Sequence, residues 1–184
     1  EWPRIVRQAF SDPMVTHEST GVHGRGTEEV KTNDVSHRIK EGEVGLVVEF
    51  GRPGIGVYFR EVQKATRVMA AEGVAFEKGN PVTQMMISTK TGDIQEDVLE
   101  EKVLSCIVEL TTSIDDTVRI LNVLKKVCKD AETVISIGAA TVCDEKGGDQ
   151  LRDILEQEGY DIGWAKLNLG LGRTTNASFT NMEN

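Results

Sequence analysis

One glycine-rich segment carries the residue types of an anion-binding turn, and it consists of Gly51, Arg52, Pro53, Gly54, Ile55 and Gly56. This glycine loop lies between a stretch with the alternation of a strand and a stretch with the spacing of a helix. Backbone N–H groups at the start of a helix point outward, and the helix dipole favours negative charge, so such a turn suits phosphate or carboxylate groups. Arg52 is the expected charged contact, because a guanidinium matches the geometry of both anions.

Glu77 adds a second feature of the same kind, since it lies 26 residues after Gly51 and follows a short apolar stretch. A dinucleotide-binding unit places an acid near this point to hold a ribose hydroxyl. However, the spacing is G-x-x-G-x-G rather than G-x-G-x-x-G, Pro53 removes one amide donor, and no Gly-Lys-Ser/Thr follows. Two interpretations stay open. One is a tight turn that needs glycine for its backbone angles; the other is a ligand site formed by Gly51, Arg52, Gly54, Gly56 and Glu77.

The histidines form neither a catalytic nor a metal-binding pattern. His17, His23 and His37 all fall in the first 37 residues, and their spacing matches no common set of metal ligands. No G-x-S-x-G segment marks a nucleophilic serine. We therefore expect no catalytic residues and no metal site, and we assign no cofactor.

A run of acidic residues begins at the turn around Gly92, and it consists of Asp93, Glu96, Asp97, Glu100 and Glu101. It lacks the fixed spacing of oxygen ligands found in a calcium-binding EF-hand loop. A charge run beside a turn is usually a solvated face, and this is how we interpret it.

Trp164 is the candidate contact for a protein partner. It shares one face of an expected strand with Lys166 and Asn168. An exposed tryptophan on an edge strand anchors many interfaces, because it buries a large area at low entropic cost. The alternative is that Trp164 covers the core beneath the N-terminal arm.

The overall charge excludes one class of partner. Lys and Arg total 21 and Asp and Glu total 30, which gives a formal net charge of −9. Such a surface repels phosphate backbones, because nucleic-acid affinity depends on cationic groups that displace counterions. No apolar run approaches the ~20 residues that span a bilayer. We therefore expect neither a nucleic-acid nor a membrane partner.

The cysteines indicate a reducing compartment. Cys106, Cys128 and Cys143 are far apart and form no C-x-x-C pair, so neither a zinc knuckle nor a redox motif is present. We expect structural thiols that pack as small hydrophobes. Together with the lack of a secretion signal at the start, they predict a cytoplasmic protein.

From residue 43 onward the chain shows the periodicities of regular elements, with alternation predicting strands and three- or four-residue spacing predicting helices. The expected elements in order are strand 43–50, helix 57–72, strands 81–89 and 102–112, helix 114–129, strand 133–143, helix 149–158 and strand 164–171. Ser113 is the expected N-cap of the second helix, with Asp116 as its capping partner.

This order predicts the α+β class, and specifically a ferredoxin-like split βαβ sandwich (βαββαβ) over residues 43–143. The last helix and strand form a C-terminal helix–strand extension that lengthens the sheet or covers an edge. We expect residues 1–42 to be a partly flexible N-terminal arm, residues 43–172 a single α+β domain, and residues 173–184 a polar tail.

These features favour a non-enzymatic binding or accessory module that engages a protein partner or a small anionic ligand and self-associates through sheet edges. The predicted core is strong while catalytic constellations are missing, and the predicted fold hosts many binding roles. The alternative is a nucleotide- or anion-binding enzyme that uses the glycine loop between strand and helix.

Overall fold

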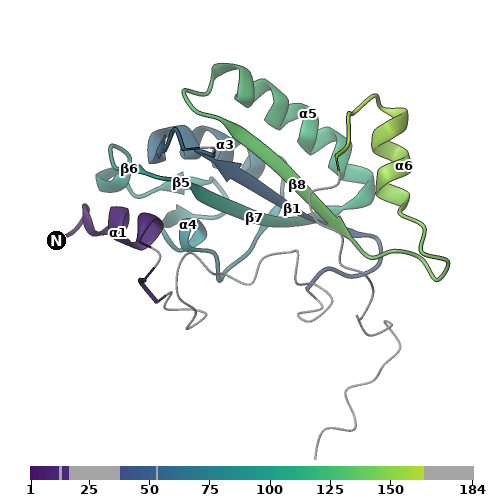
Figure 1. Cartoon of the computed structure of the whole chain (residues 1–184), viewed down its shortest axis with the longest axis horizontal. Helices are drawn as coiled ribbons and strands as arrows, with labels where there is room; N and C mark the ends of the chain where they lie inside the picture. The colour runs from purple at the N-terminus through teal and green to yellow at the C-terminus, as the bar shows by residue number, and fades with distance from the viewer. Residues whose placement is uncertain (13, 17–37, 53, 164–184) are drawn as a thin grey trace, which may run out of the picture.

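The computed structural model of the chain describes residues 1–12, 14–16, 38–52 and 54–163. Its elements in chain order are α1 (Ile5–Ser11), β1 (Glu43–Phe50), β2 (Val57–Tyr58), α3 (Phe59–Ala71), β3 (Ala75–Phe76), α4 (Pro81–Gln84), β4 (Met86–Ser88), β5 (Asp93–Ile94), η2 (Glu96–Val98), β6 (Lys102–Val103), β7 (Cys106–Ser113), α5 (Ile114–Asp130), β8 (Ile135–Thr141) and α6 (Gln150–Gln157). Helices and antiparallel strands are mixed along the chain, so the expected α+β class is confirmed (Figure 1).

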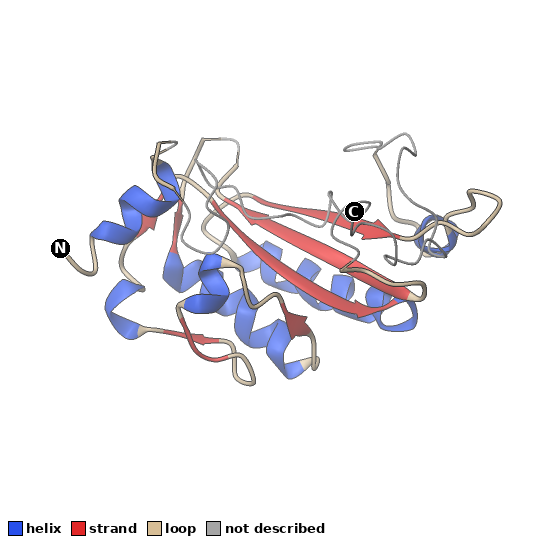
Figure 2. Ribbon diagram, turned by 90° about the horizontal axis from the view of Figure 1, so that it is seen from below, coloured by secondary structure: helices blue, strands red, loops and turns tan. Residues whose placement is uncertain are grey.

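The main sheet has four strands in the order β3-β7-β1-β8, and every neighbouring pair is antiparallel. β1 lies inside the sheet, so that Phe50 is opposite Cys106 of β7 on one side and opposite Ile135 of β8 on the other. Helices α3 and α5 contact each other and lie along the same face of the sheet (Figure 2). The fold is thus a layer of helices on a layer of strands.

Alternate residues of β1 form the centre of the core between these layers. Val44, Leu46, Val48 and Phe50 have no exposed side-chain surface. Because side chains of a strand alternate between the two faces of a sheet, this period of two is the signal that predicted the strand. Burying an apolar side chain of this size contributes about 1.5–3 kcal/mol.

Helix α5 begins where the sequence predicts. The hydroxyl of Ser113 accepts the backbone N–H of Asp116 at 3.1 Å and donates to the carboxylate of Asp116 at 2.8 Å, so the predicted N-cap is confirmed. Ile114, Leu121 and Leu124 are buried against the sheet at helical spacing. None of the helices among the described residues is long and apolar enough to cross a membrane.

Helix α1 joins the first residues of the chain to the same core. Phe10 is buried, and its ring meets the ring of Phe59 edge-on with centroids 5.4 Å apart. Arg7 pairs with Glu101, and the indole N–H of Trp2 donates to the carboxylate of Asp97. This part of the predicted arm is therefore a helix packed on the domain.

The predicted strand 81–89 is wrong in its first half. Asn80 caps a short helix there, because its side-chain oxygen accepts the N–H groups of Val82 and Thr83 at 2.9 and 3.4 Å. Pro81 occupies the first helical position, where its missing N–H costs nothing. The second half does form a strand, β4, but β4 pairs with β5 in a separate hairpin.

The main sheet takes its edge strand from a different segment, β3, which lies opposite Thr111 and Leu110. The predicted strand 102–112 is divided as well. Its first residues form β6, which pairs with β2 outside the main sheet, and β7 begins after a break at Leu104 and Ser105. The predicted helix 149–158 is confirmed as α6, whereas the predicted strand 164–171 and the polar tail lie outside the described residues.

Candidate functional site

The glycine loop leaves the end of β1 and turns back into β2. Three of its glycines have left-handed backbone angles, with φ values of 84° at Gly51, 60° at Gly54 and 76° at Gly56. Non-glycine residues rarely adopt this region, so the turn itself accounts for the glycines. The structure thus brings four of the five predicted ligand residues into one turn (51, 52, 54 and 56).

Packing adds a second reason for two of these glycines. A Cβ atom on Gly51 would lie 2.8 Å from the carbonyl oxygen of Leu104, and one on Gly56 would lie 3.0 Å from that of Val103. Around Gly54, by contrast, no atom of the described residues lies within 4 Å of such a Cβ. The loop therefore lies tightly against the connection between β6 and β7, with Gly54 at its open tip.

Three amides of the loop are used inside the chain. Gly51 donates its N–H to the carbonyl oxygen of Val134 at 2.9 Å. Ile55 and Gly56 both donate to the carbonyl oxygen of Gly51, at 3.1 and 3.2 Å. All three N–H groups are therefore bonded to carbonyl oxygens of the chain rather than directed toward a ligand.

Helix α3 begins after the loop rather than at it, because β2 intervenes and the first helical residue is Phe59. The N–H of Phe59 donates to the carbonyl oxygen of Glu101 at 3.2 Å, and that of Arg60 donates to Leu99 at 3.0 Å. The first amides of α3 are therefore also occupied. The direct strand–turn–helix junction expected for an anion site is interrupted.

Arg52 is the charged side chain of the loop. Its guanidinium lies 3.5 Å from the carboxylate of Glu49, and its Nε lies 3.5 Å from the hydroxyl of Ser105. Both contacts are long, and 41% of the Arg52 side chain is exposed. The guanidinium can therefore reach a group that approaches from solvent.

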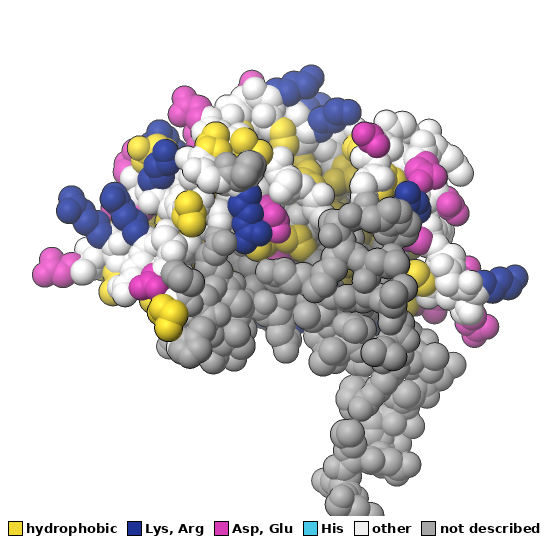
Figure 3. Space-filling view, in the orientation of Figure 1, with side chains coloured by type: hydrophobic (Ala, Val, Ile, Leu, Met, Phe, Trp, Pro, Cys, Tyr) yellow, Lys and Arg dark blue, Asp and Glu magenta, His cyan; other side chains and the backbone are white. Residues whose placement is uncertain are grey.

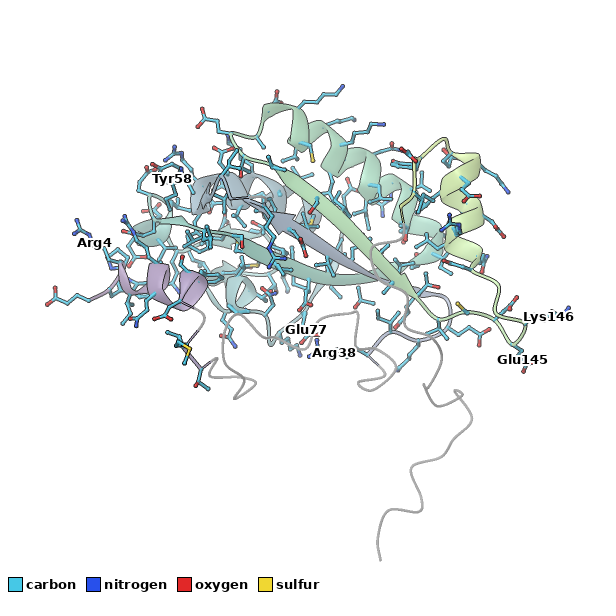
Figure 4. The ribbon with its side chains drawn as sticks, viewed as in Figure 1. Arg4, Arg38, Tyr58, Glu77, Glu145 and Lys146 are labelled. Carbon is cyan, nitrogen blue, oxygen red and sulfur yellow. The ribbon has the colours of Figure 1, made fainter. Side chains whose placement is uncertain are left out.

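Glu77 lies elsewhere, directly after the edge strand β3. Its carboxylate accepts the N–H of Gly79 at 3.0 Å and lies 3.7 Å from the guanidinium of Arg38. Figure 4 shows Arg38 and Glu77 together near the lower side of the domain, away from Tyr58, which closely follows the loop. β7 and β1 separate β3 from β8 in the sheet, so the structure does not bring Glu77 into the turn.

An apolar rim surrounds the glycine loop, and we define it as Ile55, Leu104 and Val134. These side chains are 47%, 49% and 39% exposed. The three side chains lie around the same loop because Gly51 contacts all three residues. Its N–H donates to the carbonyl oxygen of Val134, and its carbonyl oxygen accepts the N–H of Ile55. A Cβ on Gly51 would meet the carbonyl oxygen of Leu104. Figure 3 shows hydrophobic and basic side chains next to one another on the face in view. The rim could not be predicted from the sequence, because its members come from three separated segments.

A charged cluster at the start of α3 was also missed. Glu61 is buried, yet its carboxylate receives the ammonium of Lys64 at 2.8 Å and the N–H of Glu132 at 3.1 Å. Burial raises the pKa of Glu61, but the hydrogen bonds from Lys64 and Glu132 and the charges of Lys64 and Arg60 outweigh it and hold the pKa below its ordinary value. The carboxylate therefore stays ionised at neutral pH.

Arg60 completes this cluster. Its guanidinium lies 4.0 Å from the centre of the Tyr58 ring, 2.6 Å from the carboxylate of Glu100 and 3.7 Å from that of Glu132. The spacing of Glu61 and Lys64 on one helix face was a readable signal for their pair. The acidic partners of Arg60 have no such local signal. Because these charges pair with one another, the cluster fixes the start of α3 to its neighbours.

The predicted acidic run also forms separate pairs. Asp93 meets Arg67 at 2.7 Å, while Glu100 and Glu101 pair with Arg60 and Arg7. The hydroxyl of Thr91 and the guanidinium of Arg67 lower the pKa of Asp93. Within the part of the chain that the structure describes, no group of three His, Cys, Asp or Glu residues could hold a metal ion.

The remaining sequence candidates do not join the loop. Trp164 and the histidines at 17, 23 and 37 lie outside the described residues. Burial raises the pKa of the Cys128 thiol, and burial with the nearby charges of Asp149 and Asp144 raises that of Cys143. Raised pKa values keep both groups protonated at neutral pH, where thiols are weak nucleophiles.

Comparison with protein-family models, with curated proteins and with solved structures finds no match to this chain. The function must therefore be argued from its own side chains and backbone.

Proposed function

We propose that this chain is a non-enzymatic binding or accessory module that engages a protein partner through the glycine loop and its apolar rim. The observation that carries the proposal is the exposure of Ile55, Leu104 and Val134 around a turn that is itself rigidly held. Partly exposed apolar side chains on a fixed backbone lose little entropy on binding, which favours an interface.

The ferredoxin-like arrangement belongs to the same proposal. Its six elements would be β1, α3, β3, β7, α5 and β8. Two observations support it: the antiparallel sheet order β3-β7-β1-β8, and two helices on one face that each follow a strand of that sheet in the chain. Domains of this type serve many roles, so the arrangement supports no particular activity.

A protein partner is favoured over a small anion by the state of the loop amides. A phosphate cradle needs N–H groups that point outward. Here the N–H groups of Ile55 and Gly56 bond inside the turn, and that of Gly51 bonds to Val134. The N–H groups of Phe59 and Arg60 bond to the carbonyl oxygens of Glu101 and Leu99.

The alternative proposal is a nucleotide- or anion-binding enzyme at the same loop, and one observation favours it. The half-exposed guanidinium of Arg52 has contacts of 3.5 Å, which an anion at normal hydrogen-bond distance would replace. In this alternative Gly51, Gly54 and Gly56 shape the turn, and Glu77 would need to be recruited from the far side of the sheet.

The test compares capture of partners by the full chain and by rim variants. Leu104→Asp and Ile55→Asp place charge on the rim, whereas Ile87→Asp places it at a side chain that is 67% exposed on β4 and serves as the matched control. We expect a partner that is retained by the wild type and by the control and lost by both rim variants. Equal capture by all four proteins would overturn the proposal.

The alternative is tested by thermal melting of the full chain with ATP, GTP, NAD, NADP and inorganic phosphate. A ligand at ~100 times its dissociation constant adds about 2.7 kcal/mol of stability. A shift that is lost in Arg52→Gln would support the anion site and replace the protein-partner proposal. We also propose a cytoplasmic location, supported by three cysteines with no disulfide among them.

A further inference from the structure

Strand β8 is a sheet edge of unusual length for this molecule. Among the described residues it pairs with β1 alone, and it has seven residues. Every other described strand with a single neighbour has two or three residues. Ser136, Ile137 and Ala139 of β8 are exposed. A long exposed edge offers a row of N–H and C=O groups to a further strand.

The pairing with β1 fixes which residues of β8 direct their backbone N–H and C=O groups away from β1. Gly51 donates its N–H to Val134, so these two residues form a hydrogen-bonded pair at the end of the ladder. Such pairs alternate along an antiparallel ladder. The register therefore directs the N–H and C=O groups of Gly138 toward Val47 of β1. The N–H and C=O groups that point away from β1 belong to Ile135, Ile137, Ala139 and Thr141.

Charge and composition suit this edge to another strand. Residues 133–143 contain no charged side chain. Natural edge strands that avoid pairing usually carry lysine, proline or a bulge. β8 has none of these features, and its pairing with β1 runs without a register shift.

Nothing among the described residues requires glycine at position 138, in the middle of β8. Its φ lies outside the left-handed region, and an added Cβ would meet only the Cβ of Val47 at 4.0 Å, which is ordinary contact. Glycine weakens a strand interior and often marks a place where another backbone approaches closely. A glycine at this position leaves room for a further backbone to approach β8 closely.

We propose that β8 pairs antiparallel with β8 of a second copy of the chain, with Gly138 on the two-fold axis. This inference goes beyond the proposed function, because it assigns a second copy of the chain as a partner at a surface separate from the apolar rim. The outward-directed residues then face one another, Ile135 opposite Thr141 and Ile137 opposite Ala139. They can form about eight backbone hydrogen bonds in a ladder of this length.

The second copy is the occupant that this register favours. Centring the pair on Gly138 gives the longest overlap of two β8 strands, and it makes the two glycines a pair without mutual hydrogen bonds. Backbones approach most closely at such pairs, with Cα atoms ~4.5 Å apart, so glycine belongs there. Each isoleucine faces a smaller side chain, and no charge is buried. Two sheets of four strands become one sheet of eight.

Sedimentation equilibrium of the full chain from about 1 to 200 µM tests the pairing, because this range covers weak association with micromolar dissociation constants. We expect a dimer that dissociates at least tenfold more readily in Ala139→Glu, because one substitution places two charges in a symmetric interface. Ile87→Glu is the matched control and should dimerise as the wild type does. A monomer at every concentration, as expected if another segment of the same chain covers β8, overturns the proposal. So does wild-type dimerisation of Ala139→Glu.

Cross-linking tests the register without depending on a destabilised interface. Gly138→Cys in a Cys143→Ser background places two thiols across the axis, within the Cβ separation that a disulfide spans. We expect a covalent dimer under mild oxidation that dithiothreitol reverses, and no covalent dimer from Cys143→Ser alone. Failure of Gly138→Cys to cross-link at concentrations where the protein sediments as a dimer overturns the register.

The two proposals fail separately. Leu104→Asp alters the apolar rim and leaves β8 unchanged, so it should dimerise as the wild type does. A dimer with no rim-dependent partner would reject the proposed function and keep this inference. A rim-dependent partner bound by a chain that stays monomeric would reject this inference and keep the proposed function.

Discussion

The hydroxyl of Thr66, in the middle of α3, donates a 2.6 Å hydrogen bond to the carbonyl oxygen of Gly92. Gly92 closes the hairpin of β4 and β5, and its own N–H donates to Ser88 at 2.9 Å. A Cβ on Gly92 would lie 2.2 Å from the carbonyl oxygen of Thr66. The hairpin therefore lies against the helix backbone at a distance that only glycine permits.

Gly92→Ala should lower the free energy of unfolding by more than about 3 kcal/mol, because a left-handed backbone angle and a backbone collision act together. Urea unfolding followed by circular dichroism measures the change. Gly73→Ala is the matched control, since Gly73 has a φ of 76° but no atom within 4 Å of an added Cβ. Its cost should be about 1–2 kcal/mol. Equal costs at both positions would contradict the close contact.

Phe10→Ala should destabilise the whole domain by about 2–4 kcal/mol, as expected for a buried aromatic side chain. The reason is that the ring of Phe10 packs on Phe59, which has no exposed surface. Thermal melting measures the effect. Ile5→Ala, on the exposed side of the same helix, should change stability by less than about 0.5 kcal/mol. If Phe10→Ala is equally mild, helix α1 is not part of the folded core.

Glu61→Gln should make the protein less stable at neutral pH by about 1–2 kcal/mol, because the ionised carboxylate receives hydrogen bonds from Lys64 and the amide of Glu132. The pKa of Glu61 is held below its ordinary value of 4.5 in the folded chain. The stabilisation is therefore complete above that value and is lost as the pH falls through the folded pKa.

Urea unfolding of wild type and Glu61→Gln across this pH range should show two curves that converge in acid. Glu96→Gln, in the exposed turn of η2, should stay close to the wild type throughout. A gap between wild type and Glu61→Gln that stays constant with pH would show that the charge is not the source of the stabilisation.

The proposed dimer should tighten as salt is added. Each copy carries a formal net charge of −9. The register, continued past the ends of β8, brings Glu132 of each copy toward Asp144 of the other. Salt screens such repulsion. Sedimentation should show that Glu132→Lys tightens the dimer severalfold at low salt. The dissociation constant of Glu132→Gln should lie between those of the wild type and Glu132→Lys. The differences should shrink near about 0.5 M salt. A dimer that weakens with salt would contradict this arrangement.

Elements with a local pattern could be predicted from the sequence. Strand β1 was predicted with its observed bounds, because its alternate side chains enter the core. Helix α5 was predicted to within one residue, because Ser113 caps it as expected. In both cases the signal that predicts the element lies within it or at the residue just before it.

Elements fixed by distant contacts could not be predicted. β3 has only two residues, too short for any periodicity, and it exists because β7 pairs with it. Asn80 followed by Pro81 was a readable start signal for α4, but the alternating residues after it suggested a strand instead. The glycine loop was located correctly, whereas the bonds that occupy its amides come from the end of β8 and from the turn itself.

The brevity of β3 sets a limit on assembly. A protein with two long free edges can add copies at both sides without end, and this is how fibres grow. Among the described strands of the main sheet, one edge has seven residues and the other has two. Pairing through the long edge consumes it in both copies and leaves a short strand at each end of the joined sheet. Growth then stops at two subunits, so the stoichiometry is determined by the length of a strand that takes no part in the contact.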